Sequence, residues 1–196
     1  MSLEARFHIN KGDFLLDIDL ALPERGITAI MGPSGCGKTS LLRLIAGLDK
    51  STDAFLKVGE TVWQDENRFV PPHQRALGYV FQEASLFSHL NVRRNLEYGL
   101  RRLPKGTSSG SLQEAIELLG IGSLLDRHVD QLSGGEKQRV AIARALALNP
   151  DILLMDEPLA SLDTARKQEI MPYLEQLHAG ANTPVLYVSH SSDEVA

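Results

Sequence analysis

The sequence predicts an α/β domain built on a mostly parallel β-sheet. Short apolar runs bounded by glycine or polar residues alternate with helical patterns along the 196 residues. These runs lack the polar alternation of half-exposed strands, which predicts strands covered on both faces. With 43% hydrophobic residues, the chain is long enough to bury one core.

Four runs are predicted as parallel core strands, and one earlier segment as an antiparallel strand. The core strands are expected at residues 27–31, 77–81, 152–155 and 185–188. Residues 14–22 alternate apolar and acidic side chains, which is typical of a half-exposed antiparallel strand. The N-terminal part is therefore expected to be an antiparallel β subdomain beside the parallel core.

Residues of about 84–149 carry helical patterns and no convincing strand, which predicts a helical insertion between the second and third core strands. We expect a single domain over residues 1–196. Its β-rich part and first half of the core span 1–83, and the core resumes at 150–196. The clearest flexible loop is expected at 104–110, which is rich in glycine and serine.

Composition narrows the classes of partner. A net charge of -5 and a pI near 5.7 argue against a duplex nucleic-acid binder, so no nucleic-acid partner is expected. The single cysteine forms no internal disulfide, which suits a reducing compartment. No apolar run approaches the roughly 20 residues of a membrane span, and no secretory signal is present. Any membrane role is expected to come through a partner.

A glycine-rich loop follows the first core strand. The pattern G-x-x-x-x-G-K-[ST] is met between a predicted strand and a predicted helix, which is the context that a phosphate-binding loop requires. Backbone N–H groups and a lysine would face the phosphates, and a threonine hydroxyl would face Mg²⁺. The alternative is an ordinary turn, and the loop alone indicates only a nucleoside triphosphate. The predicted set is Gly32, Pro33, Ser34, Gly35, Cys36, Gly37, Lys38, Thr39 and Ser40.

Two carboxylates follow the third core strand. Asp156 and Glu157 stand at its C-terminal end, where ligands of open α/β sheets bind. Asp156 is expected to hold Mg²⁺, and Glu157 to act as the general base toward the attacking water. Taken alone, such a pair is more often a solvated strand end or a helix cap. Its combination with the phosphate loop favours the functional interpretation.

A second glycine motif precedes another predicted helix, which is expected at residues 140–148. Ser133 and Glu136 have the spacing of a capping box, which by itself is only a structural signal. Gly134 and Gly135 between them would leave backbone N–H groups open to a phosphate. One triphosphate does not need both helix starts from one subunit. The pattern therefore suggests that a second copy supplies one of them.

Together, Leu-Ser-Gly-Gly-Glu at 132–136, the phosphate loop and Asp-Glu-Pro at 156–158 resemble the ABC-transporter ATPase family over nearly the whole chain. The resemblance implies a P-loop NTPase fold, ATP and Mg²⁺ as cofactors, and a head-to-tail homodimer with ATP between the loop of one subunit and residues 133–136 of the other. It implies that Asp163 crosses the dimer interface. It also implies a catalytic set of Glu157, His190, Lys38 and Gln82, and a Mg²⁺ set of Thr39, Gln82 and Asp156.

Without the family pattern, Gln82 and His190 would be read as plain polar residues at strand ends. The resemblance implies that Gln82 links Mg²⁺ to the transporter interface and that His190 contacts the γ-phosphate. The sequence supports both roles through position, because Gln82 and His190 each follow a predicted core strand.

Within the family, residues 80–82 and 86–92, ahead of Asn95, are similar to importer subunits, and residues 157–163 and 186–191 most resemble the ATPases of molybdate importers. This implies ATP hydrolysis that drives molybdate uptake at the cytoplasmic face of a bacterial inner membrane. The implied partner is a transmembrane permease, with a periplasmic binding protein engaged only through it. Sulfate, ferric-iron or polyamine import, a soluble non-transport ABC ATPase, and a module that no longer hydrolyses ATP are the alternatives.

Two departures from the family pattern are expected to matter. The aromatic residue that stacks on adenine has no clear equivalent, and Phe7, Phe14 and Lys11 are the alternatives. The chain also stops at Ala196, soon after His190, whereas the family continues. We expect a truncated chain that binds nucleotide but dimerises and turns over weakly.

Overall fold

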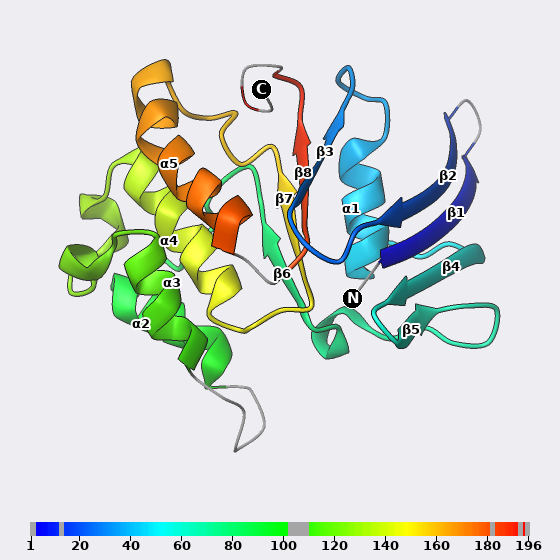
Figure 1. Cartoon of the computed structure of the whole chain (residues 1–196), viewed down its shortest axis with the longest axis horizontal. Helices are drawn as coiled ribbons and strands as arrows, with labels where there is room; N and C mark the ends of the chain where they lie inside the picture. Colours follow the sequence, from blue (N-terminus) through cyan, green and yellow to red (C-terminus); the bar gives the residue numbers. More distant parts are fainter. Residues whose placement is uncertain (1–2, 12–13, 102–109, 181–182, 192–193, 195–196) are drawn as a thin grey trace.

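Two sheets and a helical layer make up the fold, which we describe from a computed structural model covering residues 3–11, 14–101, 110–180, 183–191 and 194 (Figure 1). One sheet is antiparallel and contains the N-terminal strands, and the other is parallel. Helix α1 (Lys38–Ala46) packs between the two sheets, and the later helices cover the opposite face of the parallel sheet. The predicted α/β class is confirmed. The expected loop at 104–110 lies almost wholly outside the described residues.

The parallel sheet contains β3 (Ile27–Met31), β6 (Leu77–Val80), β7 (Ile152–Asp156) and β8 (Val185–Ser189). Each strand agrees with its predicted range to within one residue. The strand order is β3-β8-β7-β6, with every pair parallel. The last strand in the sequence therefore lies inside the sheet, between the first and the third.

The expectation that every core strand is covered on both faces holds for the two central strands. Along β7, Leu153 and Met155 pack into the helical layer, whereas Ile152 and Leu154 face α1. It is wrong for β3, whose residues are all partly exposed and whose Met31 is 47% exposed. The reason is position, because β3 is an edge strand of this sheet.

The antiparallel sheet has the order β2-β1-β4-β5. The prediction for β2 is confirmed, since it pairs antiparallel with β1, buries Leu16 and Leu22, and leaves Leu15 61% exposed. The other three strands were not predicted individually, and β5 is only four residues long. Their bounds are β1 Leu3–Lys11, β2 Phe14–Leu22, β4 Asp53–Val58 and β5 Thr61–Gln64.

The described residues between 84 and 149 form helices and no named strand, as predicted. The helix predicted at 140–148 begins earlier, because Ser133 caps it, and ends two residues sooner. No helix within the described residues combines the length and the apolar character needed to cross a membrane. The helices are α2 Val92–Leu100, α3 Gly110–Leu118, α4 Gly134–Leu146 and α5 Thr164–Gly180, with short 3-10 turns at Pro72–Gln74, Gly122–Leu124 and Val129–Gln131.

A buried arginine anchors the C-terminal end of α1, the helix that begins at Lys38. Nη1 of Arg75 donates to the carbonyl oxygens of Leu44 at 3.1 Å and Ile45 at 2.6 Å. Burial lowers the pKa of Arg75 to about 10. Gly47 ends the helix with φ +74°, and a Cβ there would lie 2.7 Å from Cζ of Arg75. Glycine is therefore required at this position both for its backbone conformation and for space.

Candidate functional site

The order of the parallel strands brings together residues that are far apart in the sequence. Strand β3 leads into the glycine-rich loop, β8 ends just before His190, and β7 ends at Asp156. Because β8 pairs between β3 and β7, the residue that follows it lies between the loop and the carboxylates. The carboxyl ends of the strands therefore form one site, as expected for an open α/β sheet.

The side chain of Lys38 is hydrogen-bonded to the start of the glycine-rich loop. Its Nζ donates to the carbonyl oxygens of Gly32 at 2.8 Å and Pro33 at 3.0 Å. Gly37 takes φ +102°, which brings the chain into α1 directly behind the loop. The loop borders a cavity of about 200 Å³. Its lining residues are Ser34, Gly35, Gly37, Lys38, Thr39, Ser40 and Glu157.

Two hydroxyl groups hold the carboxylate of Asp156, which is 7% exposed. Thr39 Oγ1 donates to Oδ1 at 2.9 Å, and the hydroxyl of Tyr79 donates to Oδ2 at 3.2 Å. Burial, and then the charge of Asp156, raises the pKa of Tyr79 above its usual range. Sequence reasoning missed Tyr79, whose only signal was a hydroxyl inside an apolar strand.

Glu157 adopts a backbone conformation that is uncommon for residues other than glycine. Its φ is +46°, and its N–H donates to the carbonyl oxygen of Val188 on β8 at 2.9 Å. Its Oε1 lies 3.9 Å from Lys38 Nζ, and its Oε2 lies 3.0 Å from His190 Nδ1. Backbone strain of this kind is concentrated at functional sites. The geometry thus supports a functional rather than a merely solvated carboxylate.

Gln82 lies apart from these contacts. It is exposed and lies just beyond β6, which pairs with β7 at the edge of the sheet. Within the described residues, no direct hydrogen bond joins Gln82 to Thr39 or Asp156. Strand pairing, rather than a hydrogen bond to these two residues, therefore places Gln82 on the same side of the sheet as the site.

The capping box at the start of α4 is present as a structural feature. Ser133 N–H donates to Glu136 Oε2 at 2.7 Å, and Glu136 N–H donates to Ser133 Oγ at 3.2 Å. The backbone N–H of Ser133 is the main cause that lowers the pKa of Glu136. A Cβ on Gly134 would lie 3.1 Å from Leu162 Cδ2, so this glycine also allows close packing.

The second glycine motif does not join the phosphate loop within one chain. Figure 1 shows α1 and α4 on opposite sides of the parallel sheet, with their starting ends well apart. Asp163 precedes α5 and accepts from the backbone N–H of Arg166 at 3.0 Å, with its side chain 59% exposed. Neither feature is among the residues that line the cavity beside the phosphate loop.

The structure removes one of the three alternatives for contact with adenine. Phe7 is 1% exposed and packs in the core beneath the antiparallel sheet, so its ring offers no face to a base. The side chains of Lys11 and Phe14 lie outside the described part of the structure.

Comparison with known proteins agrees with the fold. A family model described as ABC transporter matches residues 15–160. The chain therefore belongs to the ABC transporter family. It is 59% identical to the molybdenum import ATP-binding protein ModC of Pseudomonas fluorescens, with all of this chain and 55% of the relative covered. It is 62% identical to the protein of that name from Methylococcus capsulatus, with coverages of 99% and 54%. The chain spans about half the length of these curated relatives.

Solved structures resemble the whole chain as well. A dimeric, post-hydrolysis ATP-binding cassette, MJ0796 bound to ADP and Pi, is 29% identical, with a TM-score of 0.76 over 99% of this chain and 90% of that one. The cbiO1 protein of Clostridium perfringens, part of the ABC transporter complex cbiONQ, is 28% identical, with a TM-score of 0.83 and coverages of 99% and 80%.

Proposed function

We propose that this chain is the ATP-binding and ATP-hydrolysing part of a molybdate-importer subunit. The observation that carries the ATPase function is the meeting of Lys38, Asp156, Glu157 and His190 at one edge of the parallel sheet. Molybdate as cargo is supported by 56–62% identity to eight curated ModC proteins.

The phosphates of ATP would occupy the cavity beside residues 32–40. Residues of the loop and the first residues of α1 line this cavity, and backbone N–H groups at such a loop and helix N-terminus favour negative charge. The ammonium group of Lys38 lies against the loop carbonyls beside this cavity and would neutralise the β and γ oxygens. The cavity contains no acidic lining residue except Glu157 within the described residues.

The residues beside this cavity fit Mg²⁺. Thr39 and Asp156 offer two oxygen ligands, which are the ligand type that Mg²⁺ prefers. These two oxygens already lie within hydrogen-bonding distance of each other. Gln82 follows the neighbouring strand and would complete the set, directly or through water. When bound with ATP, Mg²⁺ would draw electron density from the phosphate oxygens and so make the γ-phosphorus easier to attack.

Glu157 is proposed as the general base. A water oxygen would form a bond to the γ-phosphorus while the bond from that phosphorus to the bridging oxygen breaks, and ADP would leave with the electron pair. Glu157 would accept the proton that the water loses. His190 holds Oε2 of Glu157 from one side and would itself contact the γ-phosphate.

The site of one subunit is proposed to be completed by a second copy. The start of α4, which carries residues 133–136, lies across the parallel sheet from α1 (Figure 1), and Asp163 is not among the residues that line the phosphate-loop cavity. Both would reach the nucleotide of the partner. The dimeric state of the MJ0796 cassette with ADP and Pi supports this arrangement. ATP would then bind between two subunits.

The wider assembly is inferred from the import function of the relatives. A transmembrane permease would bind near residues 80–82 and 86–92, and a periplasmic binding protein would act only through that permease. Asn95 is fully buried and bonds to both the N–H and the carbonyl of Phe87, which shapes this segment. The subunit would sit peripherally at the cytoplasmic face of the bacterial inner membrane.

Substitution Glu157→Gln tests the catalytic proposal. It keeps the side-chain shape but removes the base, so ATP hydrolysis should fall about 100-fold or more. ATP-bound dimers should accumulate, as measured by size-exclusion chromatography with light scattering. The control Glu60→Gln, at a side chain 99% exposed, should hydrolyse ATP normally. Full activity of Glu157→Gln would refute the role of Glu157.

The cargo is tested separately. Membrane vesicles that contain the native subunit and its permease should accumulate radioactive molybdate in an ATP-dependent manner. Uptake of sulfate, iron or a polyamine without molybdate would reassign the cargo and leave the ATPase proposal intact.

A further inference from the structure

We propose that Glu194 is a positioning residue for His190, and that its carboxylate ties the segment carrying His190 to the first turns of α5. The inference deepens the proposed function, since it rests on the role given there to His190. No part of it requires Glu194 to touch nucleotide.

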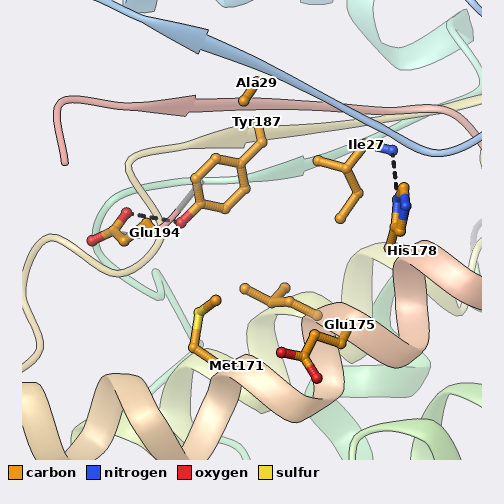
Figure 2. Close-up of a pocket in the computed structure, with 8 residues that line it drawn as sticks. Ile27, Ala29, Met171, Glu175, His178, Tyr187 and Glu194 are labelled. Atoms are coloured by element: carbon orange, nitrogen blue, oxygen red, sulfur yellow. Dashed lines mark hydrogen bonds between the residues drawn. The ribbon is translucent and has the colours of Figure 1, made fainter. Parts of the chain in front are cut away.

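Glu194 is a buried carboxylate with hydrogen bonds to both of its oxygens. Its side chain is 5% exposed. Oε2 accepts from the hydroxyl of Tyr187 at 2.9 Å and from Ser189 Oγ at 2.8 Å, and Oε1 accepts from Lys167 Nζ at 2.7 Å. Figure 2 shows the bond from Tyr187. We call these four residues the Glu194 clasp.

The clasp holds the backbone on both sides of His190. Ser189 Oγ donates to Glu194 and at the same time accepts from the backbone N–H of Ser191 at 3.0 Å. His190 itself is 52% exposed, and its ring contacts Glu157 at 3.0 Å. An exposed side chain is not fixed by packing, so its position depends on how firmly its neighbours are held.

The clasp also connects His190 to the start of α5. Lys167 lies in the first turn of that helix, and its backbone N–H donates to the carbonyl oxygen of Asp163 at 3.0 Å. Asp163 is the residue proposed to face a second copy. Lys167 and Glu194 therefore form a short path between the proposed γ-phosphate contact and the proposed dimer interface.

The charge of Glu194 is needed for this arrangement. Burial opposes ionisation, but the hydrogen bonds from Lys167, Ser189 and Tyr187 outweigh it and lower the pKa of Glu194. A charged hydrogen bond is roughly twice as strong as a neutral one, so the clasp holds most firmly with the carboxylate ionised.

One side of the clasp borders a cavity. Tyr187 and Glu194 border a cavity of about 360 Å³ between β3 and α5 (Figure 2). Glu175 lines the same cavity from α5 but is exposed, so it provides a matched control for loss of a carboxylate.

The first test separates catalysis from binding. Glu194→Gln should lower kcat for ATP hydrolysis by about 10- to 100-fold, because a small misplacement of a catalytic group has effects of this size. KM for ATP should change less than about twofold, since the phosphate loop is untouched. Glu175→Gln should alter neither value. Equal losses from both substitutions would overturn the proposal.

The second test asks whether Glu194 acts through His190. The double variant Glu194→Gln with His190→Ala should be no slower than His190→Ala alone, to within about twofold, because residues that act as one unit are not additive. A further 10-fold loss in the double variant would show an independent role and overturn the proposal.

The third test needs no activity and no nucleotide. In protein with carbon-13-labelled histidine, the Cε1–H resonance of His190 is assigned among the six histidines from its loss in His190→Ala. It should shift in Glu194→Gln and stay in place in Glu175→Gln. An unmoved resonance would overturn the positioning role.

Two further outcomes separate a failure of the clasp from a folding defect and from a failure of the proposed role of His190. If Glu194→Gln does not fold, Tyr187→Phe removes one hydrogen bond of the clasp and should move the His190 resonance in the same direction by a smaller amount; no movement would overturn the proposal. If His190→Ala hydrolyses ATP normally, the proposed role of His190 fails. A shifted resonance in Glu194→Gln would still support the clasp.

Discussion

Replacing Tyr79 by phenylalanine would remove a single oxygen atom beside Asp156. The aromatic ring would stay in place, because it stacks on Phe81 with the ring centroids 4.2 Å apart and packs against the core on the α1 side of the sheet. The loss is therefore confined to the hydrogen bond with Oδ2 of Asp156.

The size of the effect follows from the geometry of this bond. Hydrogen bonds to charged groups contribute about 1.5–3 kcal/mol, and the 3.2 Å length places this one near the lower end. A loss of about 1.5 kcal/mol should lower Tm by roughly 3–6 °C in a chain of this length. Partners that orient a metal ligand typically affect metal affinity by about 10-fold or more. The Mg²⁺-dependent gain in ADP affinity should therefore fall about 10-fold.

Differential scanning calorimetry measures the first effect, and titration calorimetry of ADP with and without Mg²⁺ measures the second. Tyr173→Phe is the matched control. Tyr173 lies on α5, away from the candidate site, and its hydroxyl accepts from Arg139 Nη1 at 3.1 Å. This control should lower Tm but leave the Mg²⁺-dependent gain unchanged. An unaltered gain in Tyr79→Phe would refute a positioning role for Tyr79.

Two further predictions concern stability. Ser133→Ala removes the side-chain cap of α4 and should cost about 1 kcal/mol, or roughly 2–4 °C in Tm by circular dichroism; an unchanged Tm would mean that the cap contributes nothing. Glu136 and Glu194 have pKa values below their ordinary 4.5, so the unfolded chain binds more protons in acid. The contribution of these two carboxylates to the free energy of unfolding should be fully present above about pH 4.5 and should be lost as the pH drops further. Urea unfolding of Glu194→Gln should show a smaller loss over this range, and an identical pH profile would contradict the assignment.

Local patterns in the sequence determined the parallel strands and the local motifs. The apolar runs predicted all four parallel strands because a buried strand needs only a short continuous apolar segment. The phosphate loop and the capping box of Ser133 and Glu136 could be predicted because their members are only a few residues apart. Backbone conformation and side-chain reach decide such motifs within one turn of chain.

The tertiary structure alone decided which distant residues meet. Lateral pairing of β8 between β3 and β7 brings His190 to Glu157, and the pairing of β6 with β7 brings Tyr79 to Asp156, 77 residues away. The same pairing leaves β3 at an edge, where its side chains stay partly exposed. The periodicity of one strand carries no information about its neighbours, because strand order depends on long-range pairing and on how the connecting helices pack.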